Sequence, residues 1–200
     1  MGISIIFSNS GDADCILIKQ MLERIPKEVI GSFIEIKKGE EIPYYDMIKA
    51  MHEEKDTILF IGHGTLYGML SPDLMEYMVW ESHFIDHVKA DRVILWWCYA
   101  SEFINQGHLT HHLKSSEILA TGMFISNAAE ATMEKITATQ EEIDKTNTSI
   151  YEMLVNMMVS TNTLDGWVDN FQKSIHPDNE IDVFNKSRIK YYKYVEEIGG

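Results

Sequence analysis

Two short apolar runs, residues 57–61 and 92–97, constrain the fold of this chain more than any other feature. Each is a series of β-branched, aliphatic or aromatic residues bounded by polar residues or glycine, which is typical of a strand buried on both faces of a parallel sheet. His63 and Gly64 follow the first run, and Cys98 follows the second. Ligand sites in open α/β sheets lie beyond the carboxyl ends of the strands, so we expect His63 and Cys98 to emerge at one edge.

The residue types at these two strand ends suit acyl transfer. A thiol becomes an effective nucleophile when a nearby imidazole takes its proton, and the fold alone has to bring the two together. On adjacent strands, about 4.8 Å apart, His63 and Cys98 would reach one substrate carbonyl. The backbone N–H groups of Gly64 and Cys98 would stabilise the oxyanion. The structural alternative is a strand that ends in a buried thiol and a histidine that only packs within a glycine-rich turn.

Residues 58–64 and 93–98, a strand followed by His-Gly and a strand followed by Cys, resemble the caspase-like cysteine peptidases. This group includes caspases, legumain, clostripain, gingipain and CHAT-type domains, and the resemblance extends from Ile3 to Ser126. Three stretches are also similar to an uncharacterised bacterial set of such domains: residues 60–70, 97–100 and 122–126. The resemblance implies an α/β fold, a three-layer α/β/α sandwich with a mostly parallel, caspase-like central sheet.

The resemblance also implies roles for individual residues. His63 would be the general base, Cys98 the nucleophile, and Gly64 an oxyanion donor of a cysteine endopeptidase. Residues after the first strand would help line the pocket for the side chain that precedes the cleaved bond, and here they include Asp12 and Asp14. Carboxylates at that point would favour arginine or lysine.

Two residues after the fifth strand, Ser126 and Asn127, are expected near the same edge as further substrate-binding candidates. Asp12 has a second interpretation, because an aspartate at this position also fits the N-cap of the helix that follows.

Two other function classes stay open. Well-studied caspase-like peptidases usually carry a small residue before the cysteine, whereas this chain has Trp97, which favours a catalytically inactive caspase-like binding or regulatory domain. The third class is a flavodoxin-like protein that binds a small ligand, because residues 8–11 follow the first strand as a phosphate loop would. That loop lacks both the Gly-x-Gly-x-x-Gly spacing and the Walker lysine.

The rest of the chain alternates between strand and helix patterns, which predicts right-handed crossovers and a mostly parallel sheet. The expected strands are residues 3–7, 33–36, 57–61, 92–97 and 118–125, the last most securely over 123–125, with a short edge strand at 77–80. The first expected helix has its apolar face at residues 16–25, with Cys15 in its first turns and Pro26 closing it. The other expected helices are residues 43–53, 82–89, 101–106, 127–143 and 149–159. The polar residues 140–147 are expected to form an exposed loop between the last two helices.

Composition indicates a single globular domain spanning residues 1–200, with a helical C-terminal part from about residue 127. The chain is 45% hydrophobic and 24% charged, and its net charge of −14 comes from 31 acidic against 17 basic residues. This balance argues against nucleic-acid binding and against attachment to an anionic membrane. No secretory signal or spanning apolar run is visible, and two cysteines suggest no disulfide framework, so a cytoplasmic location is expected.

A metal or organic cofactor is not expected. His83 and His87 are four residues apart, and His108, His111 and His112 form a cluster, but no His-Glu-x-x-His motif or cysteine pair accompanies them. Cys15 is expected to be a small buried apolar residue. The expected partner is a peptide or protein substrate, and the sequence leaves the oligomeric state open.

Overall fold

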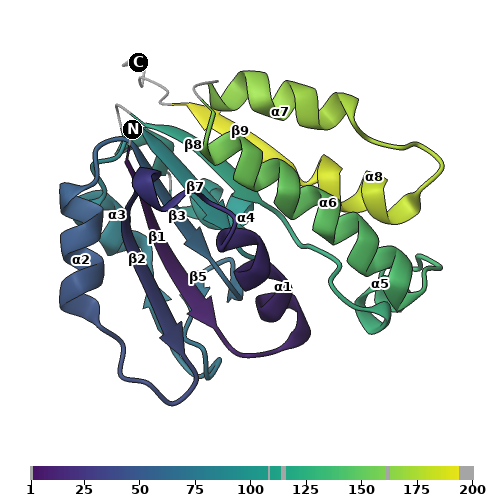
Figure 1. Cartoon of the computed structure of the whole chain (residues 1–200), viewed down its shortest axis with the longest axis horizontal. Helices are drawn as coiled ribbons and strands as arrows, with labels where there is room; N and C mark the ends of the chain where they lie inside the picture. The colour runs from purple at the N-terminus through teal and green to yellow at the C-terminus, as the bar shows by residue number, and fades with distance from the viewer. Residues whose placement is uncertain (1, 108, 114–115, 161–162, 194–200) are drawn as a thin grey trace.

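The computed structural model describes residues 2–107, 109–113, 116–160 and 163–193, and it is an α/β structure built on a six-stranded sheet (Figure 1). The strands are β1 Ile3–Asn9, β2 Ile30–Lys37, β3 Thr57–Ile61, β7 Arg92–Trp96, β8 Glu117–Thr121 and β9 Ile189–Lys193. Their order is β2-β1-β3-β7-β8-β9, and every neighbouring pair is parallel except β8 and β9. The α/β class and the mostly parallel sheet predicted from the sequence are confirmed.

Helices cover both faces of this sheet. The helices are α1 Ala13–Leu22, α2 Tyr44–Glu53, α3 Glu81–His87, α4 Ala100–Gln106, α5 Ala128–Met133, α6 Gln140–Met158, α7 Leu164–Lys173 and α8 Glu180–Ser187, with 3-10 turns at Lys27–Val29 and Leu109–His111. Because strand side chains alternate, Leu59 and Ile94 join the core under α1, α6 and α7, whereas Phe60 and Leu95 join the core under α2 and α4. Each such fully buried side chain contributes about 1.5–3 kcal/mol.

A second, three-stranded antiparallel sheet follows β3. Its strands are β4 Gly64–Thr65, β5 Gly68–Leu70 and β6 Tyr77–Val79. The short strand expected at residues 77–80 is therefore present, although it belongs to this small sheet and not to an edge of the main one. Among all the helices in the described ranges, none is both long and apolar enough to cross a membrane.

The fifth strand is present but shorter than predicted, since it covers Glu117–Thr121 and not the whole of residues 118–125. β8 ends at Thr121, and residues 123–125 lie outside it, so the prediction of a strand there was wrong. The backbone of Ile125 bonds to side chains instead of a neighbouring strand. Its N–H donates to Asn185 Oδ1 at 2.8 Å, and its carbonyl accepts from the side-chain amides of Asn147 and Asn185, each at 3.0 Å. The buried side-chain amides of Asn147 and Asn185 thus make the hydrogen bonds to this backbone that a neighbouring strand would otherwise make.

The segment between residues 127 and 159 also differs from its prediction. The helix expected over 127–143 is broken, because α5 ends at Met133 and a turn through Lys135 precedes α6. Residues 140–147, expected as an exposed loop, are the first turns of α6. A capping box begins that helix: the Thr139 side chain accepts from the Glu142 N–H, and the Glu142 side chain accepts from the Thr139 N–H. Ile143 and Asn147 then face inward and are buried.

The C-terminal part is helical from α5 to α8, as expected, but it ends in the strand β9, which was not predicted. β9 pairs antiparallel with β8, and Tyr191 lies opposite Leu119. Its sequence, Ile-Lys-Tyr-Tyr-Lys, does not alternate apolar and polar residues as a half-buried strand would. The free edge of β8, not the local pattern, makes this segment a strand.

Candidate active site

The two central strands end in register. Ile61 of β3 pairs with Trp96 of β7, and the N–H of Gly62 donates to the Trp96 carbonyl at 3.2 Å. His63 and Cys98 each stand two residues beyond that last pair. The strands are therefore neighbours, as expected, and both residues lie at the carboxyl edge of the sheet.

The His63 side chain pairs with a residue from the β1 side of this edge. Its Nε2 atom lies 2.5 Å from Asp12 Oδ2, and β1 flanks β3 on the side away from β7. Asp12 is the N-cap of α1, because its Oδ1 accepts from the Cys15 N–H at 2.9 Å. The helix consequently begins at Ala13, with Cys15 in its first turn, and the capping interpretation of Asp12 is confirmed.

The electrostatics of this pair favour an imidazolium and a carboxylate at neutral pH. A side-chain hydrogen bond with Cys15, opposed by burial and reinforced by Asp12, raises the pKa of His63 to about 9. Burial alone would raise the pKa of the Asp12 carboxyl. Hydrogen bonds from the Cys15 N–H, Ser10 and His63 outweigh this effect and lower the pKa to about 2. In this conformation His63 already carries a proton at pH 7.

The thiol of Cys98 has different neighbours. It points to the carbonyl of Phe124, which is 3.9 Å away. Phe124 follows β8, and β8 flanks β7 on the side opposite to β3. Burial raises the pKa of Cys98 to about 11, and the carboxylates of Glu130, Asp14 and Glu102 add to this shift. At pH 7 the residue is a neutral thiol, so the candidate base and nucleophile are both held by other partners.

Alkylation tests this protonation state. Iodoacetamide should modify Cys98 slowly in the native protein at pH 7, and the rate should rise about tenfold per pH unit until the pH approaches 11. In urea, where the pKa returns to about 9, the same thiol should react about a hundredfold faster at pH 8. Mass spectrometry of the digested protein separates Cys98 from Cys15. Rapid modification of native Cys98 at pH 7 would contradict the raised pKa of this thiol.

Trp97 and Gly64 pack against each other on the opposite face of the sheet. Trp97 belongs to the core under α2 and α4, whereas Cys98 packs against the core under α1 and α6. A Cβ atom on residue 64 would lie 2.2 Å from Trp97 Cδ1, so only glycine fits there. The indole Nε1 donates to the Thr65 carbonyl at 3.1 Å. The bulky ring therefore fills a core and points away from the Cys98 thiol.

Two of the four substrate-binding candidates line one pocket. Asp14 and Ser126 contribute to a cavity of about 200 Å³ between α1 and α6. The Tyr151 hydroxyl donates to Asp14 Oδ1 at 3.0 Å, and burial, which outweighs this bond, raises the pKa of Asp14 to about 6. Asn127 does not line the pocket; it caps α5 by accepting from the Glu130 N–H.

Sequence reasoning missed two members of this pocket, Asp144 and Asn147. Both come from the segment that was expected to be an exposed loop. Recognising the Thr139–Glu142 capping box would have placed Asp144, Asn147 and Tyr151 on one helical face, because they are three and four residues apart.

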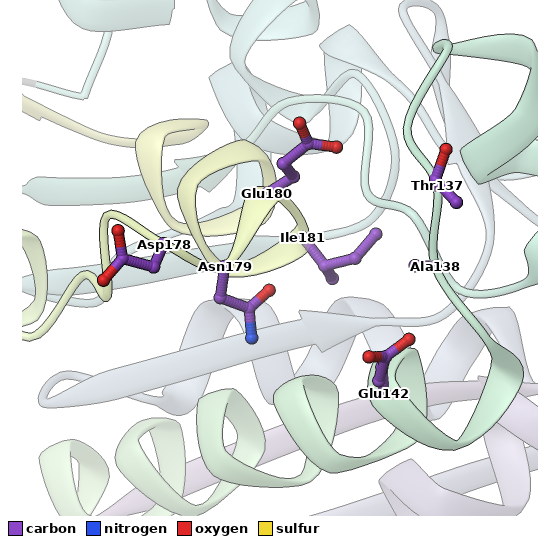
Figure 2. Close-up of a pocket in the computed structure, with 7 residues that line it drawn as sticks. All are labelled: Thr137, Ala138, Glu142, Asp178, Asn179, Glu180 and Ile181. Carbon is purple, nitrogen blue, oxygen red and sulfur yellow. The ribbon is translucent and has the colours of Figure 1, made fainter.

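A larger cavity, of about 560 Å³, lies between the start of α6 and α8 (Figure 2). The residues that line it are Thr137, Ala138, Glu142, Asp178, Asn179, Glu180 and Ile181. None of these seven residues is a candidate nucleophile, base or oxyanion donor, so the cavity is separate from the candidate active site.

His83, the first of the histidines considered and set aside as metal ligands, lies against an aromatic side chain. His83 is 6% exposed, and its ring packs against Trp80 in a tilted arrangement with centroids 4.0 Å apart. His108 lies outside the described residues. The described part of the chain instead brings together Asp12, Cys15 and His63, a group that the sequence analysis did not consider as ligands.

Neither a scan against protein-family models nor a search of the curated proteins finds a match to this chain.

Proposed function

We propose that this chain is a cysteine endopeptidase with a caspase-like α/β/α sandwich fold, and that it cleaves peptide bonds after basic residues. The observation that carries the proposal is the register of β3 and β7, which leaves His63 and Cys98 at equivalent positions beyond Ile61 and Trp96. A base and a nucleophile on adjacent strands can be directed at one substrate carbonyl.

In the proposed reaction, the Cys98 sulfur attacks the carbonyl carbon of the scissile bond while its proton passes to His63. His63 then gives that proton to the leaving amine as the C–N bond breaks, and the acyl group stays on the sulfur as a thioester. Water that loses a proton to His63 then attacks the thioester carbon, the C–S bond breaks, and His63 returns the proton to the Cys98 sulfur. The N–H groups of Gly64 and Cys98 are the proposed oxyanion donors.

This reaction requires the resting contacts of both side chains to change when substrate binds. His63 has to leave Asp12 and Cys15, after which its pKa returns toward the ordinary value of about 6.5 and the ring can accept a proton. The Cys98 thiol has to turn from the Phe124 carbonyl toward the substrate. The proposed enzyme is therefore inactive at rest.

The preference for basic residues rests on the pocket between α1 and α6. Two carboxylates, Asp14 and Asp144, line a cavity of about 200 Å³. An arginine or lysine side chain entering it would pair with a carboxylate and compensate its buried charge. The net charge of −14 would also attract a cationic peptide.

A second candidate function is a catalytically inactive domain of the same fold that binds or regulates a partner. The observation in its favour is the state of the dyad, because the Cys98 pKa of about 11 keeps the nucleophile protonated. The flavodoxin-like alternative has less support, because the Asp12 carboxylate already occupies the N-terminus of α1 where a phosphate would bind.

A substrate-like covalent probe separates the first two functions. We expect a peptide chloromethyl ketone that ends in arginine to alkylate Cys98 of the intact chain, as located by mass spectrometry. The His63→Ala variant should react about 10²–10⁴-fold more slowly, because the imidazole no longer takes the thiol proton. Asp14→Asn should slow the arginine probe but leave a leucine probe unaffected.

Matched controls for these variants are His52→Ala and Asp86→Asn, which change exposed side chains on α2 and α3. Both should react as the unmodified protein does. Lack of any adduct at Cys98 with arginine, lysine or leucine probes would reject the peptidase and favour the inactive binding domain. Equal rates for arginine and leucine probes would reject the basic specificity only.

A further inference from the structure

Three chemically different side chains meet where α1 begins and β3 ends. An oxygen of Asp12, the sulfur of Cys15 and a ring nitrogen of His63 all lie within 4.8 Å of one another. Asp12 and Cys15 are the N-cap and a first-turn residue of α1, and His63 follows β3. One backbone hydrogen bond, from Cys15 N–H to Asp12 Oδ1, holds the first two in place.

The spacing of these atoms suits a small tetrahedral cation. Metal–ligand bonds of about 2.0–2.3 Å place neighbouring ligand atoms roughly 3.3–3.8 Å apart. The His63 Nε2 and Asp12 Oδ2 atoms are now 2.5 Å apart, so an ion between them requires a separation of only about 1 Å more. Side-chain rotation supplies this movement without a change in the backbone.

The combination of thiolate, imidazole and carboxylate indicates which cation would bind. Hard ions such as Mg²⁺ and Ca²⁺ prefer sites made only of oxygen, whereas zinc accepts sulfur, nitrogen and oxygen together. The two anionic ligands would neutralise a divalent charge. The Ser10 hydroxyl lies 2.7 Å from Asp12 Oδ2 and 3.4 Å from Cys15 Sγ, where it can orient both ligands from the outer shell.

Access to the group is from one side. Cys15 is fully buried, but the side chains of Asp12 and His63 are 43% and 30% exposed. An ion would therefore enter past these two residues and reach the sulfur last. Three protein ligands would leave a fourth position for water, as in open zinc sites.

We propose that Asp12, Cys15 and His63 bind one zinc-class divalent ion. The zinc proposal does not depend on the peptidase proposal, although both involve His63. An imidazole bound to the ion cannot move a proton for Cys98, so the ion and the proposed catalytic cycle exclude each other.

Metal titration of the intact, chelator-treated chain tests the site. Zn²⁺ should bind with one-to-one stoichiometry in competition with a chromophoric chelator. Co²⁺ should give a thiolate-to-metal charge-transfer absorption that Cys15→Ser removes. Asp12→Asn, Cys15→Ser and His63→Ala should each weaken zinc binding at least about tenfold. Asparagine keeps the helix cap, so Asp12→Asn removes the charged ligand without removing the cap.

The matched controls are Asp86→Asn, Cys98→Ser and His52→Ala, which should bind zinc as the unmodified chain does. Circular dichroism establishes that each variant is folded. If Cys15→Ser does not fold, the variants at the partly exposed Asp12 and His63 still test the site. Absence of saturable binding, or unchanged affinity in Asp12→Asn and His63→Ala, would overturn the proposal. Because Cys98→Ser removes the covalent-probe reaction but not the zinc ligands, the two proposals fail independently.

Discussion

Replacing Cys98 by serine is expected to lower the cleavage rate of an arginine-containing peptide by at least about 10³-fold. The hydroxyl is a far weaker nucleophile than a thiolate. Serine nearly preserves the shape of the side chain, and the sulfur makes only a 3.9 Å contact with the Phe124 carbonyl. The fold should therefore be unaffected, and the loss should appear in kcat.

Cys15→Ser is the matched control for this experiment, because Cys15 is the other thiol near His63. Cys15 is fully buried and forms no bond to substrate in the proposed reaction, and its contact with His63 belongs to the resting state. Its variant should therefore keep most of the activity in metal-free buffer. Loss of activity in Cys15→Ser with retention in Cys98→Ser would mean that the nucleophile is misassigned. The comparison uses a fluorogenic peptide and freshly reduced protein.

The largest expected loss of stability comes from Lys186→Met. Lys186 Nζ lies 2.8 Å from Asp182 Oδ1 on α8, and their side chains are only 3% and 4% exposed. The ammonium also donates to the Ser174 carbonyl at 3.0 Å, and Asp182 accepts from the His176 N–H at 2.7 Å. Removing the cation leaves a buried carboxylate without its partner, which should cost about 3–5 kcal/mol in the free energy of unfolding.

Urea denaturation followed by circular dichroism measures this loss. Lys173→Met, an exposed substitution on α7, is the matched control and should change stability by less than about 0.5 kcal/mol. Adding Asp182→Asn to Lys186→Met should recover part of the loss, since the unpaired charge is then gone. A loss below about 1 kcal/mol in Lys186→Met would show that the pair is not buried as described.

The sequence predicted the central strands well because their signal is local. Residues 57–61 and 92–97 are continuous apolar runs, and burial on both faces is the condition that such runs satisfy. The helix at residues 43–53 was also predicted with nearly its observed bounds, since proline and an apolar stripe mark it. His63 and Cys98 were correctly expected at one sheet edge on the same reasoning.

Other elements depended on partners that are distant in the chain. Residues 123–125 have the composition of a strand, but the amides of Asn147 and Asn185 take the backbone hydrogen bonds of Ile125. β9 is a strand because β8 offers it an edge. Neither partner is visible from the local pattern.

By itself, then, the sequence determined the α/β class, the positions of the central strands and the placement of His63 and Cys98 at one edge. These follow from local apolar patterns and from the geometry that parallel strands share. Only the tertiary structure decided which groups those two side chains contact. His63 meets Asp12 and Cys15, and Cys98 meets Phe124, because α1 and the segment after β8 pack against the edge from opposite sides. Side-chain contacts of this kind depend on packing between distant segments, which local patterns do not encode.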